Sequence, residues 1–293
     1  MQQNIKKRTI GTHNGSFHAD EVTACALLLV FGLADRSGIV RTRDPAILDT
    51  CEFVCDVGGE YIPEKKKFDH HQAEYQASLS SAGMVLKYLL DSGTVSQEEY
   101  AHLNNLLVMG VDAHDNGVDL TVKGVTTYSH IIANFVPIEY EASDKEQDAA
   151  FDRALEFAME HLKRLIERRR YILSFTSIVE AAMKPRALSL QFDQSIPWMD
   201  AFFALHGEEH PAQFVVMPSG ENWKLRGIPP NSKEKMKVRK ALPEEWAGLS
   251  DDDLAKASGI PGAIFCHKGR FFSLWKTKED ALKALEFTIK RGS

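Results

Sequence analysis

The chain has 293 residues, of which 44% are hydrophobic and 26% are charged, and its net charge is −6. This is the composition of an ordinary soluble globular protein, and the length suits two domains with separate cores. The acidic balance argues against broad, non-specific adhesion to nucleic acid, but it leaves room for a nucleic acid held by metal ions and a few basic side chains.

Nothing in the sequence predicts a membrane span, because the longest apolar run, ACALLLVFGLA, is shorter than the roughly 18 residues required. The N-terminal stretch carries no apolar signal core, so we expect a cytoplasmic protein. The cysteines Cys25, Cys51, Cys55 and Cys266 are too few and too scattered for a disulfide framework, and they lack zinc-finger spacing. We expect buried free thiols.

Strands and helices alternate in the first half of the chain. The predicted strands are 7–15, 38–44, 52–59 and 66–71, and the predicted helices are 20–33, 44–51 and 78–93. Such alternation is typical of a parallel α/β sheet, in which sites collect beyond the carboxyl ends of the strands. We expect the polar clusters at that edge: 13–20, 56, 69–71 and 112–116.

The second half begins with a long or broken amphipathic helix over 144–183. After it we predict strands at 186–192, 212–218 and 222–228, a partly helical segment at 243–260, a hairpin at 263–275 and a helix at 277–290. The expected organisation is an α/β domain over 1–143, a helical linker over 144–185 and a smaller α+β domain over 186–293. The linker helix could form the surface of a homodimer, or its apolar stripe could be satisfied within the monomer.

Four clusters of histidine and carboxylate side chains carry the candidate chemistry. The first, THNGSFHADE, offers His13, His18 and Asp20 in a loop between a strand and a helix. The second is Asp56, at the end of an apolar strand, where a carboxylate is costly unless it is paired, hydrogen-bonded or metal-bound. Capping of local backbone amides is the alternative role for these side chains.

The third cluster is the run of Asp69, His70 and His71. Adjacent side chains of an extended segment point to opposite faces, so at most two of them could reach one ion directly. The third could orient a ligand or handle protons. The fourth cluster, GVDAHDNGV, offers Asp112 and Asp115 but is also typical of a turn, and spacing does not choose between the two carboxylates.

Mixed carboxylate and imidazole ligands suit manganese, magnesium, iron or zinc, and the oxygen-rich balance favours manganese or magnesium. There are more candidate ligands than one ion needs, whereas two ions about 3.5–4 Å apart with a bridging carboxylate fit the number. Such a pair lowers the pKa of a bridging water and holds phosphoryl oxygens. The residues alone therefore predict a metal-dependent phosphoester hydrolase.

The motif order also resembles a known family. DHH, preceded by His-x4-His-x-Asp and a strand-end Asp and followed by a later Asp, resembles the pattern of the DHH phosphoesterases. The stretches GTHNGSFHADEVTACALL, FDHHQ, VDAHDNG, SGIPGAIFCHKGRF and RGIPP…RKALPEEWAGL are more closely similar to the MYG1 exonuclease family. This resemblance implies a DHH-type catalytic domain and a 3′–5′ exonuclease acting on RNA or short oligonucleotides.

The resemblance also implies site roles. One ion would be held by His13, His18 and Asp56, and the other by Asp20, Asp56, His70 and one of Asp112 or Asp115. Asp56 would then bridge the two ions, which we expect to be Mn²⁺, with Mg²⁺ or Zn²⁺ as alternatives. His71 would contact the scissile phosphate or assist proton transfer, and Asp69 would orient the histidines. His18 departs from ordinary DHH members, which usually carry Asp there.

The second domain should then hold the substrate. Candidate phosphate-binding residues are Arg226, Lys237, Arg239, Lys240, His267, Lys268 and Arg270. The lysine-rich run could equally be a solvated loop. The tryptophans Trp198, Trp223, Trp246 and Trp275 could stack bases, but core packing is the favoured interpretation.

Two other functions would keep the same site. One is hydrolysis of a small phosphate compound such as pyrophosphate or a cyclic dinucleotide, which the acidic net charge mildly favours. The other is a non-catalytic metal or nucleotide sensor.

Overall fold

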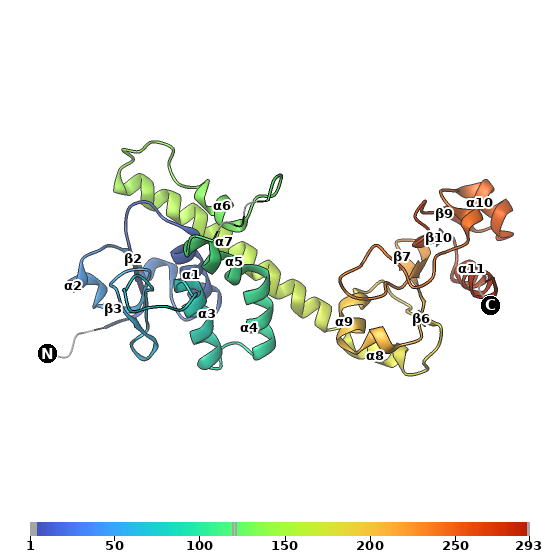
Figure 1. Ribbon diagram of the computed structural model, residues 1–293, viewed down its shortest axis with the longest axis horizontal. Coiled ribbons are helices and arrows are strands. Elements are labelled where there is room, and N and C mark those ends of the chain that lie inside the picture. The colour runs from blue at the N-terminus through green and yellow to red at the C-terminus, as the bar shows by residue number, and fades with distance from the viewer. Residues whose placement is uncertain (1–4, 119, 121, 292–293) are drawn as a thin grey trace. The chain divides into compact units, whose positions relative to one another are not determined.

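The computed structural model describes residues 5–118, 120 and 122–291 (Figure 1). The chain divides into two compact units, Met1–Glu167 and Arg168–Ser293, and the division falls inside one long helix. Each unit has its own sheet and its own core. Among the residues that the structure describes, no helix has the length and apolarity that a membrane crossing requires.

The first unit is built on a five-stranded sheet in the order β2-β1-β3-β5-β4. Its strands are β1 (Lys6–Thr12), β2 (Ile39–Arg41), β3 (Cys51–Cys55), β4 (Tyr61–Ile62) and β5 (Lys67–Phe68). The first three and β5 are parallel, which confirms the parallel sheet predicted from the alternating pattern. The edge strand β4, which the pattern did not predict, runs antiparallel to β5.

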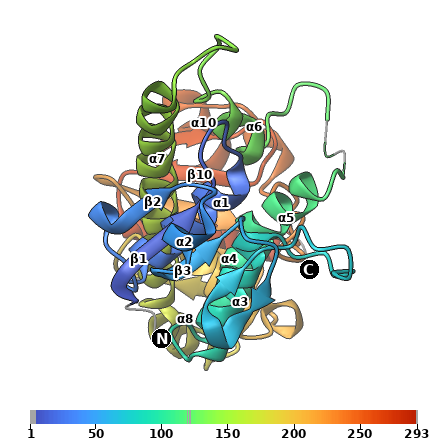
Figure 2. The same ribbon diagram turned by 90° about the vertical axis from the view of Figure 1, so that its left-hand side faces the viewer.

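The helices of this unit bury the sheet. They are α1 (Ala19–Val30), α2 (Pro45–Leu48), α3 (Ser81–Asp91), α4 (Gln97–Leu103), α5 (Met109–Asp115), α6 (Tyr128–Ala133) and the first part of α7 (Asp144–Leu173). Single 3₁₀ turns lie at Arg36–Gly38 and Pro63–Lys65, and a π-helical stretch, Asn104–Val108, joins α4 to α5. Helix α1 is buried from Ala19 to Leu28 and contacts β3, α3, α5 and α6, so it forms the centre of the core (Figure 2).

Two predictions for this unit need correction. The cluster at 112–116 reaches the predicted edge through Asp115, but it does so from a helix and not from a strand end, because Leu103, Leu107 and Val111 are buried at helical spacing and keep the chain helical through Asp115. The strand predicted over 66–71 ends at Phe68, and the Asp69 carboxylate then accepts from the His71 amide at 3.1 Å, a local turn contact that replaces the sheet pairing. The DHH residues therefore lie just beyond β5.

The second unit holds a mixed sheet in the order β6-β7-β8-β10-β9. Its strands are β6 (Ser189–Gln191), β7 (Phe214–Ser219), β8 (Asn222–Gly227), β9 (Ala263–Cys266) and β10 (Phe272–Trp275). Only the β6–β7 pair is parallel, and β9 and β10 form the antiparallel pair predicted as a hairpin. This arrangement matches the mixed α and β character expected of this half of the chain.

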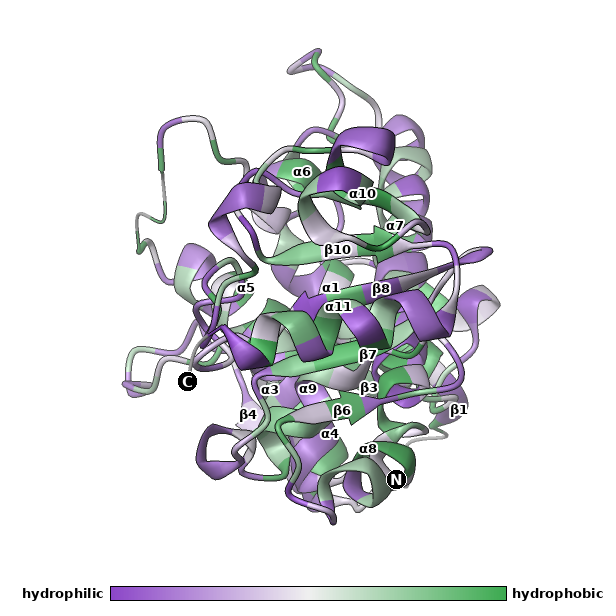
Figure 3. Ribbon diagram, turned by 90° about the vertical axis from the view of Figure 1, so that its right-hand side faces the viewer, coloured by the Kyte–Doolittle hydropathy of each residue, from purple (hydrophilic) through white to green (hydrophobic). Residues whose placement is uncertain are grey.

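Helices cover both faces of the second sheet. They are α8 (Thr176–Met183), α9 (Trp198–Ala204), α10 (Asp251–Ser258) and α11 (Lys278–Lys290), with 3₁₀ turns at Gly207–Glu209 and Glu244–Trp246. Helix α11 lies across β7 and β8 (Figure 3) and buries Ala281, Ala284, Leu285 and Thr288. Trp198, Trp246 and Trp275 are buried in the two cores of this unit, which confirms core packing for these three indoles. All four cysteines are buried and free, as expected.

Candidate metal centre

The carboxyl ends of three parallel strands bring most of the candidate ligands together. His13 follows β1, Asp56 follows β3, and Asp69, His70 and His71 follow β5. Parallel strands end at one edge of the sheet, so these residues meet although they lie up to 58 positions apart, 71 minus 13, in the sequence. The N-terminus of α1 and the end of α5 add further carboxylates to the same edge.

Asp56 lies at the centre of this cluster. Its Oδ2 is 3.5 Å from His13 Nε2, whereas its Oδ1 is 3.7 Å from His70 Nε2 and 3.4 Å from His71 Nδ1. The two oxygens of one carboxylate thus face separate histidines. The residue has a positive φ of 57°, a conformation that costs a side-chain-bearing residue on the order of 1–2 kcal/mol. Its amide is tied down by a 2.9 Å hydrogen bond to the carbonyl of Phe68.

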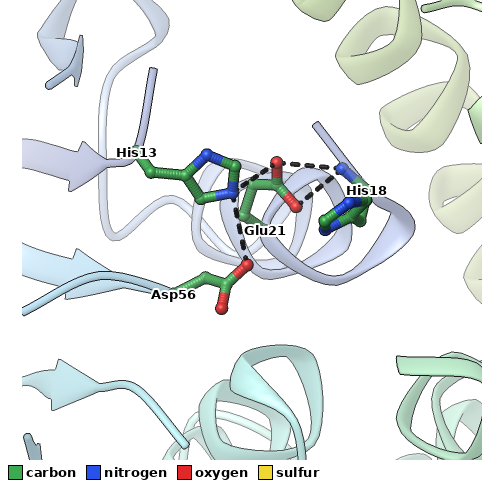
Figure 4. A group of neighbouring side chains, drawn as sticks. All are labelled: His13, His18, Glu21 and Asp56. Atoms are coloured by element: carbon green, nitrogen blue, oxygen red, sulfur yellow. Dashed lines mark hydrogen bonds and ion pairs between the residues drawn. The ribbon is translucent and has the colours of Figure 1, made fainter. Parts of the chain in front are cut away.

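The first group of possible ligands consists of His13, His18, Glu21 and Asp56, whose ligand atoms all lie within 4.8 Å of one another. Figure 4 shows the imidazole of His13 between the carboxylates of Glu21 and Asp56. The Glu21 oxygen is 3.1 Å from His13 Nε2, and the same carboxylate accepts from the backbone amide of His18 at 3.0 Å. Glu21 therefore links the first helical turn to the first histidine.

Glu21 is not among the ligands predicted from the sequence. Glu21 lies three residues after His18, the N-cap of α1, which is the spacing of a capping box. That spacing could have identified Glu21 as a residue that contacts the start of the helix. The side chain is fully buried. A buried glutamate beside a histidine and an aspartate is a further candidate ligand or a partner that orients His13.

The second group consists of Asp20, His70 and Asp115, again with ligand atoms within 4.8 Å of one another. His70 Nε2 is 2.8 Å from Asp115 Oδ2 and 3.9 Å from Asp20 Oδ2. A third group, formed by Asp56, His70 and His71, overlaps the other two. Asp56 and His70 thus connect all three groups.

Asp112 is occupied elsewhere and belongs to none of these groups. Its Oδ1 accepts hydrogen bonds from the Ser80 amide at 3.0 Å, the Ser80 hydroxyl at 2.7 Å and the Gly83 amide at 3.1 Å. These contacts cap the N-terminus of α3. Of the two carboxylates that spacing left open, the geometry favours Asp115, and a metal role for Asp112 stays a prediction that these contacts oppose.

Asp20 also caps α3, with its two oxygens accepting from the amides of Ala82 at 2.6 Å and Ser81 at 2.9 Å. Ser80 occupies the N-cap position of α3, but its hydroxyl bonds to Asp20 and Asp112 rather than to its own helix. Two carboxylates, from α1 and α5, thus cap α3 in place of the serine side chain. Asp20 remains close enough to His70 to be shared between the helix and a metal ion.

Asp69 orients His71. Its Oδ1 lies 2.8 Å from His71 Nδ1 and accepts from the His71 amide at 3.1 Å, and its Oδ2 accepts from the Gly59 amide at 2.6 Å. Burial would raise the pKa of Asp69, but the Gly59 amide and His71 lower it below its usual value. The His71 side chain is 63% exposed, so a fixed imidazole faces solvent.

The buried carboxylates raise the pKa of the histidines between them. Burial alone would lower the pKa of His13, but hydrogen bonds to Asp56 and Glu21 raise it to about 10. A hydrogen bond to Asp115 raises the pKa of His70 to about 9. Burial, joined by the charges of Glu21 and Asp115, raises the pKa of Asp56 although its hydrogen bond to His13 lowers it. So much negative charge in a buried site calls for positive charge within it.

The donor set fits divalent cations. Asp56 Oδ1 is buried and makes no hydrogen bond within the described part of the chain, as expected of an atom that serves as a metal ligand. His70 Nε2 faces carboxylate oxygens alone among the described contacts, with Asp115 at 2.8 Å, Asp56 at 3.7 Å and Asp20 at 3.9 Å. Carboxylates and imidazoles without cysteine suit manganese, magnesium or zinc. A pocket of about 390 Å³ opens beside these residues. Its lining consists of His13, Asn14, Ser16, His18, Arg43, Asp56, Val57, Gly58, Asp69 and His71.

Comparison with known proteins identifies the family. Residues 9–289 match the model of the MYG1 exonuclease family, described as Uncharacterised protein family (UPF0160). The chain belongs to this family. The membership predicted from the sequence motifs is confirmed.

Relatives within the MYG1 exonuclease family cover nearly the whole chain. The chain is 50% identical over 283 residues to the MYG1 protein of Chlamydia pneumoniae, an alignment that covers 97% of each chain. It is 33% identical over 329 residues to the MYG1 exonuclease of Homo sapiens, covering 97% of this chain and 86% of the human one. Among solved structures, RecJ of Thermus thermophilus in complex with Mn²⁺ matches at 14% identity and a TM-score of 0.29, covering 96% of this chain and 52% of RecJ. Similarity at that TM-score does not establish a common fold.

In this MYG1-family chain, the basic residues predicted to bind substrate lie in the second unit, and several are engaged in local contacts. The Arg239 guanidinium donates to four backbone carbonyls, those of Gly207, His210, Ala212 and Pro229. Lys240 donates to the carbonyl of Ile289, and Lys237 pairs with Glu234. These contacts show that the Arg239 guanidinium holds local backbone segments together. Binding of substrate by Arg239 stays a prediction.

The remaining basic candidates make fewer contacts with the described residues. His267, Lys268 and Arg270 lie in the turn between β9 and β10, and His267 Nδ1 accepts from the Gly269 amide at 2.9 Å. Arg226 is on β8, where its Nη2 donates to the carbonyl of Lys235 at 3.3 Å and its Nε has no partner in the described chain. Lys268 and Arg270 make no ion pair with any described residue.

Proposed function

We propose that this protein is a metal-dependent phosphodiesterase that removes nucleotides from the 3′ end of RNA or short oligonucleotides, using two divalent ions. Asp56 carries the proposal, because its two oxygens face different histidines and one of them makes no hydrogen bond in the described chain. The relatives named MYG1 exonuclease in Homo sapiens and Rattus norvegicus support an exonuclease.

The proposed ligands follow the two groups of the site. One ion would be held by His13, His18 and Asp56, with Glu21 as an added ligand or as the partner that positions His13. The other would be held by Asp20, Asp56, His70 and Asp115. Mn²⁺ is the proposed working ion, since oxygen ligands predominate, and Mg²⁺ or Zn²⁺ are the alternatives.

Two such ions, when bound, activate a water for attack and neutralise charge on the phosphoryl group. The chain itself supplies proton transfer through His71. Because Asp69 holds Nδ1 at 2.8 Å, the ring is fixed with Nε2 directed away from Asp69, where it can deliver a proton to the leaving oxygen. Asp69 thereby sets both the tautomer and the direction of His71.

The second unit would bind the phosphates of the nucleotide chain. Lys268 and Arg270 carry this proposal, with Arg226 and His267 beside them on β8 and in the same turn. A guanidinium or ammonium without a carboxylate partner retains its full capacity to bind phosphate. Lys237, Lys240 and Arg239 are weaker candidates, since each already has a local acceptor.

The test is hydrolysis of matched RNA and DNA oligonucleotides by metal-stripped protein, to which Mn²⁺, Mg²⁺ or Zn²⁺ is added. A 5′-labelled RNA should shorten stepwise, and a 3′-labelled RNA should release a labelled mononucleotide at once. His71→Ala should abolish both while keeping its metal, and Lys65→Ala, an exposed substitution in the same unit, should leave both intact. Internal cuts, or cleavage that persists in His71→Ala, would refute the proposal.

A second candidate, hydrolysis of a small phosphate compound, is favoured by the net charge of −6, which would repel a long polyanion. Pyrophosphate and a cyclic dinucleotide in the same assay distinguish it from the exonuclease. A metal or nucleotide sensor would turn over none of these substrates.

A further inference from the structure

Arg43 is a cation at the metal pocket that has no anionic partner among the described residues. It is exposed, it follows β2, and it lines the 390 Å³ pocket together with His13, Asp56 and His71. Its side chain makes no hydrogen bond or ion pair with any described residue. Carboxylates are nevertheless close at hand, because Asp56 and Asp69 line the same pocket.

The neighbouring Arg41 behaves differently and shows what a structural arginine does here. Its guanidinium is buried, lies 2.7 Å from Asp148 and donates to the carbonyl of Gly15 at 2.6 Å. Arg41 therefore holds the loop that carries His13 and His18 in place. Arg43 has no such structural contact, and its guanidinium is available to a ligand.

Arg43 also lines a second pocket of about 330 Å³, which shares Val57 and Gly58 with the metal pocket. Its apolar lining consists of Pro45, Leu48, Val54 and Val57, and its polar lining of Asp49, Glu60 and Lys67. Lys67 Nζ lies 2.6 Å from Glu60 and 3.4 Å from Asp49, so the polar groups form one ion-paired cluster. The pocket thus combines apolar walls with several hydrogen-bonding groups.

This combination matches a nucleobase, which has flat apolar faces and donors and acceptors along its edge. A phosphate in the metal pocket would meet Arg43 at the boundary between the two pockets. The ribose would then span the shared residues Val57 and Gly58, and the base would enter the second pocket.

We propose that the two pockets form a single nucleotide site, in which Arg43 binds the phosphate and the pocket lined by Pro45, Leu48 and Val54 binds the base. This proposal rests on the proposed function and names how one nucleotide of the substrate is held. It places base binding on the first unit, beside the metal centre. Arg43 is then a substrate-binding residue and not a metal ligand.

Calorimetric titration of the Mn²⁺-loaded full chain with adenosine 5′-monophosphate and with ribose 5-phosphate tests this. Arg43→Ala should weaken both ligands by about tenfold to a hundredfold, because a charged hydrogen-bonding partner is lost, and Arg43→Lys should weaken them less. Pro45→Trp should fill the second pocket and weaken only the adenosine nucleotide. Lys65→Ala, which removes one positive charge outside both pockets, should change neither affinity.

If Pro45→Trp does not fold, base binding can be tested on the unmodified protein by comparing the two ligands. The unmodified protein should bind adenosine 5′-monophosphate at least about tenfold tighter than ribose 5-phosphate, since only the nucleotide carries a base. Equal affinities for the two ligands, or unchanged phosphate binding in Arg43→Ala, would overturn the proposal. Tight, Arg43-dependent nucleotide binding without RNA cleavage would refute the exonuclease and support the nucleotide site.

Discussion

Replacing Asp56 by asparagine removes the shared carboxylate while keeping its shape. Asparagine tolerates the left-handed backbone found at this position, where φ is 57°, so the loop should keep its path. Both groups of histidines lose their common anionic partner, because Oδ2 faces His13 at 3.5 Å and Oδ1 faces His70 at 3.7 Å. We expect Asp56→Asn to lose both ions, not one.

The magnitude follows from linkage between metal binding and folding. One site filled at a hundred times its Kd stabilises the folded state by about 2.7 kcal/mol, so two sites contribute about 5 kcal/mol. For a unit of this size, 1 kcal/mol changes Tm by about 2–4 °C, and Mn²⁺ should raise the Tm of the unmodified protein by about 10–20 °C. Asp56→Asn should lose nearly all of that gain.

Without Mn²⁺, the Tm of Asp56→Asn should equal or exceed the Tm of the unmodified protein. Burial raises the pKa of Asp56 above its value in the unfolded chain, so its ionised form costs stability at every pH above that value. A neutral asparagine avoids this cost. At pH 8 without metal, we expect Asp56→Asn to melt at the same temperature as the unmodified protein or higher.

Metal content per chain after dialysis, together with melting curves with and without Mn²⁺, gives the result. Asp112→Asn is the matched control, because it neutralises another buried carboxylate that bonds to Ser80 and Gly83 and lies in none of the ligand groups. It should still bind two ions and keep the Mn²⁺-dependent gain in Tm. Two ions per chain in Asp56→Asn, with an undiminished Tm gain, would refute the bridging role.

The remaining predictions concern proton transfer, pH and the second unit. His71→Ala should lower kcat by about 10²–10⁴-fold with both ions still present by metal analysis, and loss of metal would instead make His71 a ligand. Mn²⁺ affinity should rise from pH 7 to pH 9, because a ligating imidazole must be neutral and the pKa values of His13 and His70 are raised to about 10 and about 9. Titration at several pH values measures this, and a flat profile would contradict it. Arg239→Ala should destabilise the protein by about 2–4 kcal/mol in denaturant unfolding, since four carbonyls lose their donor, whereas an unchanged midpoint would exclude a structural role.

The sequence correctly predicted which site residues lie together where each residue follows the end of a strand. His13, Asp56 and His70 each follow a strand of a parallel sheet, and the alternating pattern is enough to predict that such residues share an edge. The proximity of these three residues can therefore be predicted without any knowledge of side-chain packing. The same reasoning failed for Asp112 and Asp115, because they lie on a helix whose orientation depends on distant contacts.

The choice between those two carboxylates illustrates what local spacing leaves out. They are three residues apart on α5, yet Asp112 bonds to Ser80 at the start of α3 and Asp115 lies beside His70. Burial of Val111 in the core fixes which way each carboxylate points. That orientation comes from tertiary packing. Glu21 differs, because its capping-box spacing was visible in the sequence although its contact with His13 was not.

The N-terminus of α3 gives the site an internal source of positive charge. Its first amides, from Ser80 to Gly83, all donate to Asp20 or Asp112, so the positive end of the helix dipole faces two buried carboxylates. Asp20 is therefore stabilised on one side by the helix, while its Oδ2 also lies 3.9 Å from His70. Because the backbone of α3 already joins α1 to α5 through these carboxylates, metal ions are not needed to assemble the three helices. Binding of the two proposed ions would then stabilise mainly the groups around Asp56, where the backbone is strained and an oxygen makes no hydrogen bond within the described residues.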